Sequence, residues 1–159
     1  MWTLGLLLAV FTVFTPLNGV VLAEGEVVNI PDPALEALIR ESLEKPEGDI
    51  TAADMSRVTQ IVGEYGDPVS DLTGLEYAIN LERFMISGSS TLDDISPIKD
   101  LKNIKLFSLE SSISYGIDDY IPLVDLSPIA DYENLEYLTL KKLANVEKLP
   151  DTITIVRPS

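Results

Sequence analysis

One short pattern occurs three times in this 159-residue chain, and its apolar spacing is one that few folds can use. Each copy runs Asp, an apolar residue, Ser or Thr, Pro or Gly, and a second apolar residue. The copies begin at Asp71, Asp94 and Asp125. Each leads into the spacing Leu-x-x-Leu-x-Leu or a close variant of it, whose last positions alternate as in a half-buried β-strand. Such self-similarity predicts a protein built from repeated units.

The strand-like segments begin at residues 58, 81, 104 and 135, and the first of them is a degenerate copy. Successive starts are 23, 23 and 31 residues apart, so the long third step indicates an insertion near residues 115–122. A period in the low twenties is typical of a leucine-rich repeat, in which a strand and a return segment make each coil. Stacked coils bury a continuous core that one coil cannot. We therefore predict an α/β solenoid over residues 58–159, a short right-handed leucine-rich repeat with a parallel β-sheet on its concave face.

Residues 24–57 differ from the repeats and predict a helical N-terminal cap. Asp32 is placed to cap a helix whose first position is Pro33, and apolar residues then recur at helical spacing. A second short helix is expected from Thr51, because Asp54 follows three residues later in an arrangement that resembles a capping box. We expect these helices to cover the open end of the repeat core.

Residues 1–23 carry no charged side chain and contain an apolar run from Leu4 to Phe14. The run has the length of a signal-peptide core and is too short to span a bilayer as a helix, which needs about 20 residues. Val21 and Ala23 form an acceptable small-residue cleavage site. We predict a signal peptide over residues 1–23 and an extracellular protein that is either secreted or associated with the cell surface. An uncleaved N-terminal anchor remains the alternative.

Composition excludes several kinds of site. The chain has no His and no Cys, which removes zinc fingers, disulfides, Ser-His-Asp triads and Cys nucleophiles. It has 26 acidic and 11 basic residues, and the resulting net charge of −15 argues against nucleic acid as a partner. All of these charges follow residue 23, so the acidity belongs to the predicted mature domain.

Paired carboxylates occur at Asp93 and Asp94 and again at Asp118 and Asp119. Adjacent residues on a solenoid turn do not face each other across a cleft, as the two carboxylates of a glycosidase must. The repeated Asp residues are better explained as turn residues that hydrogen-bond their local backbone. No calcium-loop pattern is present. We expect no enzymatic activity, catalytic residue, cofactor or metal ligand, and keep catalysis and calcium binding as minor alternatives.

The segments Asp94–Ile98 and Asp125–Ile129 both read Asp-apolar-Ser-Pro-Ile, and a cap string runs from Ile30 to Arg40. In these features the chain resembles the internalin-type leucine-rich repeat proteins of bacterial surfaces. The resemblance covers residues 28–150. It implies an exported, curved solenoid that binds a protein or other macromolecule on its concave strand face.

Two features depart from that family. Members usually have Asn after the Leu-x-Leu strand, where it forms an internal ladder to backbone groups, whereas this chain has Ser89, Ser112 and Leu143 at about those places. In addition, no Ig-like domain, cell-wall repeat or sorting motif follows Pro150. We therefore expect an irregular last coil, and the C-terminal sequence gives no support for surface anchoring.

Strand alternation predicts which side chains the concave face presents. Val62, Met85, Leu106 and Tyr137 are expected to form one apolar stripe across neighbouring strands, and contiguous apolar patches often mark interfaces. Arg83 is either an ionic anchor for a partner or the ion-pair partner of a nearby Glu. The predicted binding residues on this face are Val62, Arg83, Met85, Leu106, Ser108, Tyr137, Thr139 and Lys141.

These features favour a secreted or surface module that mediates protein–protein interaction through its concave face. We expect a monomer whose partner is a macromolecule, a protein rather than nucleic acid, and which has no membrane span after signal cleavage. The alternative is a structural spacer within a larger bacterial surface protein, without a ligand of its own. The insertion at residues 115–122 is either a second contact site or a tolerated bulge on the convex side.

Overall fold

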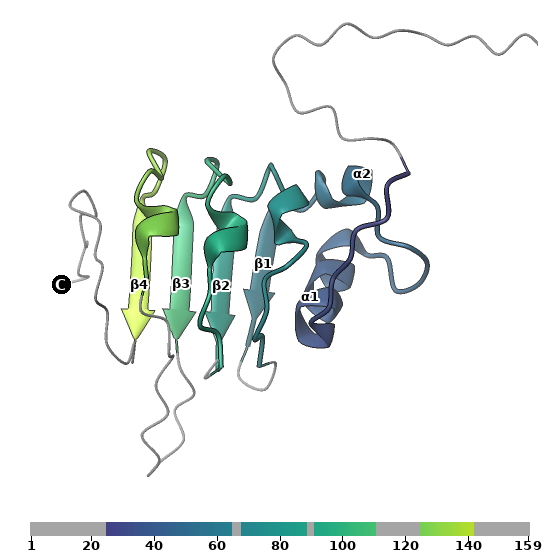
Figure 1. Ribbon diagram of the computed structural model, residues 1–159, viewed down its shortest axis with the longest axis horizontal. Helices are drawn as coiled ribbons and strands as arrows, with labels where there is room; N and C mark the ends of the chain where they lie inside the picture. Colours follow the sequence, from purple (N-terminus) through teal and green to yellow (C-terminus); the bar gives the residue numbers. More distant parts are fainter. Residues whose placement is uncertain (1–24, 65–67, 89–90, 111–124, 142–159) are drawn as a thin grey trace, which may run out of the picture.

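A computed structural model describes residues 25–64, 68–88, 91–110 and 125–141 (Figure 1). Several sequence-based predictions fall outside these residues. They concern the signal peptide at residues 1–23, the insertion at 115–122, the positions of Ser89, Ser112 and Leu143, and the segment after Pro150.

The described residues form two helices followed by four strands that alternate with short 3-10 helices. The helices are α1 (Pro33–Leu43) and α2 (Ala52–Met55). The strands are β1 (Gln60–Gly63), β2 (Arg83–Ser87), β3 (Leu106–Glu110) and β4 (Tyr137–Lys141). The 3-10 helices are η1 (Leu75–Tyr77), η2 (Ser96–Ile98) and η3 (Ser127–Ile129).

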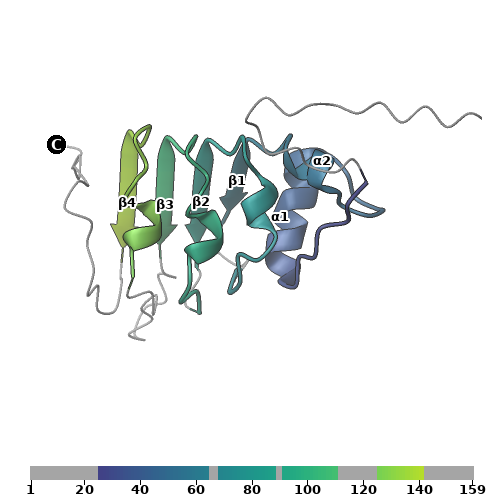
Figure 2. The same ribbon diagram turned by 45° about the horizontal axis from the view of Figure 1, so that its top comes forward.

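The four strands form one parallel sheet in chain order, β1-β2-β3-β4. Equivalent repeat positions pair across all of them, so that Ile61, Phe84, Phe107 and Leu138 are in register. The three 3-10 helices line up along one side of this sheet (Figures 1 and 2). The predicted parallel sheet and its solenoid-like arrangement are therefore confirmed.

The core lies between the sheet and the 3-10 helices. Every second strand residue points into it, and Phe84 and Phe107 are fully buried with ring centroids 5.3 Å apart. The two apolar positions of the Asp-apolar-Ser-Pro-apolar motif also point inward. Buried residues at these positions are Leu72, Leu75, Ile95, Ile98, Leu126 and Ile129. The spacing that predicted the repeat is thus the spacing that fills the core.

The repeated Asp residues are turn residues, as predicted. One carboxylate oxygen of Asp94 accepts the backbone N–H of Ser96 at 2.7 Å, and the other accepts its hydroxyl at 2.8 Å. Asp71 and Asp125 accept the backbone N–H two residues later, each at 2.8 Å. Each Asp therefore folds the chain locally into the next 3-10 helix.

An asparagine ladder is present at a place where the sequence did not predict one. Asn80, Asn103 and Asn134 stand just before the apolar residue that opens each strand segment, and each donates from its side-chain amide to a carbonyl of the preceding coil. The accepting carbonyls belong to Ser56 at 2.8 Å, Ile79 at 2.9 Å and Lys102 at 2.8 Å. These side chains join successive coils on their exposed edge.

Tyr132 adds a coil-to-coil bond inside the core. Its repeat equivalents are Ala78 and Leu101, and all three are buried. The hydroxyl of Tyr132 donates to the carbonyl of Ile98 in the preceding coil at 2.5 Å. Burial and then the nearby charge of Asp100 raise the pKa of Tyr132, so the hydroxyl remains a donor.

Helix α1 is capped by Asp32 and packs against β1. The packing depends on Gly63, which occupies the core position that Ile86 and Leu109 hold in the next two strands. A Cβ atom at Gly63 would lie 3.0 Å from a methyl carbon of Leu38 in α1. The missing side chain thus makes room for the helix at the N-terminal end of the core.

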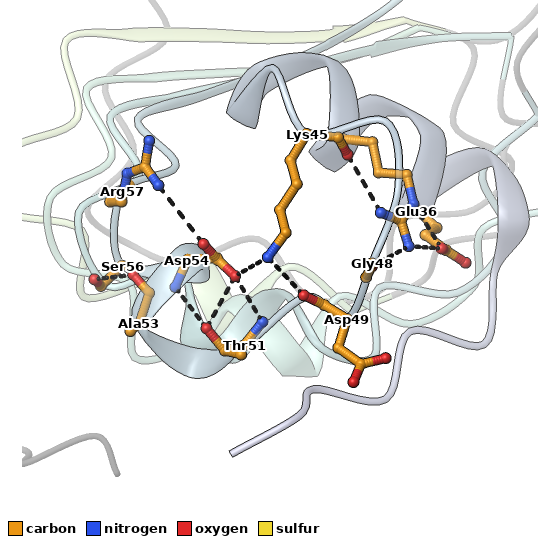
Figure 3. A network of polar contacts seen from close by, with 10 residues as sticks. Glu36, Lys45, Gly48, Asp49, Thr51, Ala53, Asp54, Ser56 and Arg57 are labelled. Carbon is orange, nitrogen blue, oxygen red and sulfur yellow. Dashed lines mark hydrogen bonds and ion pairs between the residues drawn. The ribbon is translucent and has the colours of Figure 1, made fainter. Parts of the chain in front are cut away.

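A polar network connects α1 and α2 (Figure 3). Asp54 accepts the backbone N–H of Thr51 at 3.0 Å and the ammonium of Lys45 at 2.8 Å, while the Thr51 hydroxyl accepts the N–H of Asp54, completing the predicted capping box. The hydrogen bonds from Lys45 and then Thr51 lower the pKa of Asp54 to about 2. Arg40 pairs with Glu36 at 2.7 Å. The Glu36–Arg40 pair lies within α1, whereas the contact between Lys45 and Asp54 links the end of α1 to α2.

Gly74 replaces the Pro found in the other two motif copies, Pro97 and Pro128. Its φ is +97°, a backbone conformation that Pro cannot adopt. A Cβ at Gly74 would lie 2.8 Å from the carbonyl oxygen of Asn29, because the N-terminal segment packs directly over this coil. The variant first motif is therefore a consequence of contact with residues 25–31.

Asp32 ties α1 to the first repeat. One carboxylate oxygen accepts the backbone N–H groups of Ala34 and Leu35, both at 2.9 Å. The other accepts the N–H and hydroxyl of Ser70 at 2.7 and 2.8 Å and the N–H of Asp71 at 3.1 Å. The residue is only 5% exposed. Burial by itself would raise the pKa of Asp32, but the hydrogen bonds from Leu35 and Ser70 outweigh it and lower the pKa.

We predict that Asp32→Asn lowers the free energy of unfolding at pH 7 by roughly 2 to 3 kcal/mol, because an amide cannot accept on both sides. Asp94→Asn, at an exposed turn, should cost less than about 0.5 kcal/mol. A carboxyl with a lowered folded-state pKa stabilises above its unfolded value of 3.8, and this contribution is lost as the pH falls through the folded value. Urea unfolding followed by circular dichroism should show the gap between wild type and Asp32→Asn narrowing below pH 4. A gap that is constant with pH would contradict the assignment.

We also predict that Gly74→Pro, which restores the motif of the other copies, destabilises the fold by about 3 kcal/mol or more, because Pro fixes a negative φ. Pro97→Gly should cost about 1 kcal/mol or less, through the entropy of the unfolded chain. Thermal unfolding of both variants tests this. A stabilised Gly74→Pro protein would show that the first coil does not need the left-handed backbone.

That residues 24–57 act as a cap which the repeat core requires stays a prediction. Deletion of these residues should expose Ile61 and the neighbouring core at β1 and cause aggregation. Size-exclusion chromatography and circular dichroism of the shortened chain would measure this. A folded, monodisperse product would show that the repeat core does not require residues 24–57 as a cap.

Candidate binding face

The outward side chains of β1 to β4 form a surface that we call the sheet face. The parallel register arranges them in three rows across the strands. The first row is Gln60, Arg83, Leu106 and Tyr137. The second row is Val62, Met85, Ser108 and Thr139. The third row is Ser87, Glu110 and Lys141.

All eight residues predicted as a binding site therefore lie on one surface, but the expected single apolar stripe is wrong. Val62 and Met85 belong to the second row, whereas Leu106 and Tyr137 belong to the first. The apolar residues form a stepped band whose step lies between β2 and β3. The sequence contained this information, since Met85 is four residues after its repeat start and Leu106 is two residues after its own.

The two ends of the stepped band are the most exposed. Tyr137 is 59% exposed and Val62 is 42% exposed, while Met85 and Leu106 are half-buried. Among the described residues, one further large apolar side chain is this exposed, Val27 in the N-terminal segment. The sheet face thus holds two of the three large, exposed apolar side chains of the described part.

Ser108 is the least exposed residue of the sheet face. It is only 6% exposed although it points away from the core, because it lies between Met85 and Thr139 in its row and between Leu106 and Glu110 along β3. The expectation that Ser108 is solvent-facing is therefore wrong in degree. Its side chain is smaller than those of the four neighbours that cover it.

The two predicted basic residues of the face differ in their surroundings. Lys141 pairs with Glu110 on the neighbouring strand at 2.9 Å. Arg83 is exposed and makes no ion pair or side-chain hydrogen bond in the described part of the chain. The nearby Glu82 pairs instead with Lys105 at 3.0 Å. The predicted alternative in which Arg83 pairs with a Glu is thus not observed. That Arg83 is an ionic anchor for a partner stays a hypothesis.

An acidic hollow with a volume of about 410 Å³ lies on the side of the 3-10 helices. Its lining includes Asp93, Asp94, Asp100 and Asp131 together with Lys99. Within the described residues, no three acidic side chains are grouped closely enough to hold a metal ion. The other predicted carboxylate pair, Asp118 and Asp119, lies outside those residues.

No family model and no curated protein matches the chain. Solved structures do. A structure of the CBM51-2 and INT domains of ZmpB from Clostridium perfringens, in complex with GlcNAc, is 37% identical over 52% of this chain and 17% of its own, with a TM-score of 0.47. Internalin C2 of Listeria monocytogenes is 20% identical over 73% and 58%, with a TM-score of 0.44. A further Listeria monocytogenes internalin is 24% identical over 73% and 45%, with a TM-score of 0.38.

These likenesses are partial, and the chain spans less than two thirds of the length of each of these three proteins. The solenoid-like arrangement itself rests on the observed parallel sheet. In the part of the chain that is described, no helix is long and apolar enough to cross a membrane.

Proposed function

We propose that this chain is an exported leucine-rich repeat module that binds a protein partner through the sheet face. The observation that carries the proposal is the stepped apolar band, in which exposed Tyr137 and Val62 flank half-buried Met85 and Leu106 on one continuous surface. Exposed apolar side chains that gather on one face, rather than lying scattered, are typical of interaction sites.

The chemistry of the face favours a protein as the partner. Aromatic residues, Met and Arg are enriched at the cores of protein interfaces, and this face offers Tyr137, Met85 and Arg83. A nucleic acid would need clustered basic residues, whereas the chain carries a net charge of −15. The rigid sheet beneath the face would keep the cost of ordering low, because its backbone is already fixed by strand pairing.

The proposal also covers export, capping and oligomeric state. A signal peptide over residues 1–23 would export the chain to the bacterial exterior, and residues 24–57 would cap a right-handed solenoid whose sheet face is concave. The module would act as a monomer without catalytic activity or a cofactor. Its work would be recognition by shape, with stability supplied by stacked apolar residues such as Ile86 and Leu109.

We predict that the double variant Met85→Ala, Tyr137→Ala weakens partner binding at least tenfold, since truncated aromatic anchors commonly cost about 2 kcal/mol. Lys99→Ala, at an exposed position near η2 on the other side of the sheet, is the matched control and should bind as wild type does. The immobilised protein would be used to capture partners from a surface-protein fraction by cross-linking. The affinity of each identified partner would then be measured by biolayer interferometry.

Equal affinity of the double variant and wild type for every captured partner would rule out the sheet face as the binding surface. If no partner is captured by wild type above the level of the double variant, the spacer function becomes the better description. Circular dichroism of both variants would confirm that the fold is kept, as expected for side chains that point away from the core.

A further inference from the structure

The sheet face differs in charge from the chain as a whole. The chain has a net charge of −15, whereas the outward side chains of the four strands carry two positive charges, Arg83 and Lys141, against the single negative charge of Glu110. Glu64, which follows β1, makes the face neutral. At physiological salt, exposed charges act over about 8 Å, so local charge governs which groups can approach the surface. An acidic partner therefore meets less repulsion at this face than the net charge of the chain alone would suggest.

Arg83 is the positively charged residue of the sheet face that has no ion-pair partner among the described residues. Lys141 is paired with Glu110, whereas Arg83 has no ion-pair partner among the described residues. A guanidinium is charged at every relevant pH, and its planar donors match the two oxygens of a carboxylate. The side chain is thus exposed, charged and available to a carboxylate from outside.

The apolar part of the face lies directly beside Arg83. Leu106 is its row neighbour on β3, and Ser108 is two residues further along that strand. With strands about 4.8 Å apart and a rise of about 3.3 Å per residue, the backbone at Ser108 is about 8 Å from the backbone at Arg83. An extended segment places side chains i and i+2 on one face, about 6.6 Å apart. The difference of about 1.4 Å from the Arg83–Ser108 separation is within the reach of the long, exposed Arg83 side chain.

We propose that the partner presents a carboxylate two residues from a large apolar side chain in an extended segment. The carboxylate pairs with Arg83, and the apolar side chain packs over Ser108 between Met85 and Thr139, with Tyr137 beside it. This inference rests on the proposed function of the sheet face, and it adds the chemistry of the partner: an acidic and apolar protein segment.

A selection from displayed random 12-residue peptides tests the proposal on the purified protein, after expression of the full chain. Wild type, Arg83→Glu and Lys99→Glu are each used as bait. Lys99→Glu makes the same change of charge on the opposite side and is therefore the matched control. The peptides enriched on wild type should share Asp or Glu two residues from Leu, Ile, Phe or Trp. On Arg83→Glu the acidic position should be replaced by Lys or Arg.

The enriched wild-type peptide is then synthesised and titrated. Its affinity should fall at least tenfold on Arg83→Glu, less than twofold on Lys99→Glu, and partly recover on Arg83→Lys. Substitution of its acidic residue by Asn or Gln should abolish the difference between wild type and Arg83→Glu. The affinity for wild type should also fall as salt is raised from 50 to 500 mM, since a salt-screened pair contributes to it.

Peptides without a shared acidic residue that still lose binding to the Met85→Ala, Tyr137→Ala variant would overturn this inference and leave the proposed function standing. Peptides that bind this variant as well as wild type would overturn both, because the sheet face would then not be the binding surface. An absence of enrichment on wild type over the double variant would likewise overturn the inference.

Discussion

The register between coils is fixed by backbone carbonyls that each accept two N–H groups from the next coil. The carbonyl of Thr59 accepts from Glu82 and Arg83 at 2.9 and 3.2 Å, and that of Glu82 accepts from the next strand in the same way, at 2.8 and 3.1 Å. The pattern recurs at Lys105, at 2.8 and 2.9 Å. Because a shift of one residue would turn every side chain to the opposite face, this ladder decides both what the core contains and what the sheet face presents.

The fold was readable from the sequence because its signals are periodic and local. Phe84 and Phe107 are buried because of their place in the repeat. Asp94 and Asp125 stand at the same motif position and make the same local turn. The coil-to-coil contacts were harder to see. Asn80 and its two equivalents join neighbouring coils just before each strand, and their acceptors are carbonyls 24 or 32 residues away, which no local pattern reveals.

The irregularities of the first repeat have a common cause in the N-terminal segment. Gly63 lacks a side chain where Leu38 of α1 packs, Gly74 adopts a positive φ beneath Asn29, and Asp32 receives the N–H of Ser70. When only the repeat motif is considered, the first copy lacks part of the pattern at these residues. Their contacts with residues 25–43 explain them instead, because the next coil lacks these contacts and has Ile86 and Pro97 at the places of Gly63 and Gly74.

The outward position of the candidate residues could be predicted from the sequence, but their exposure and ion pairing could not, for a physical reason. Strand alternation says which side chains point outward, yet exposure depends on the size of their neighbours on adjacent strands, as the burial of Ser108 illustrates. Charge is likewise decided across strands, because Glu110 compensates Lys141, and Glu82 pairs with Lys105 although it is adjacent to Arg83 in sequence. The backbone hydrogen bonds that set the register between coils thus also leave Arg83 exposed beside the stepped apolar band. This is the combination of charge and apolar surface that a partner of the proposed module would recognise.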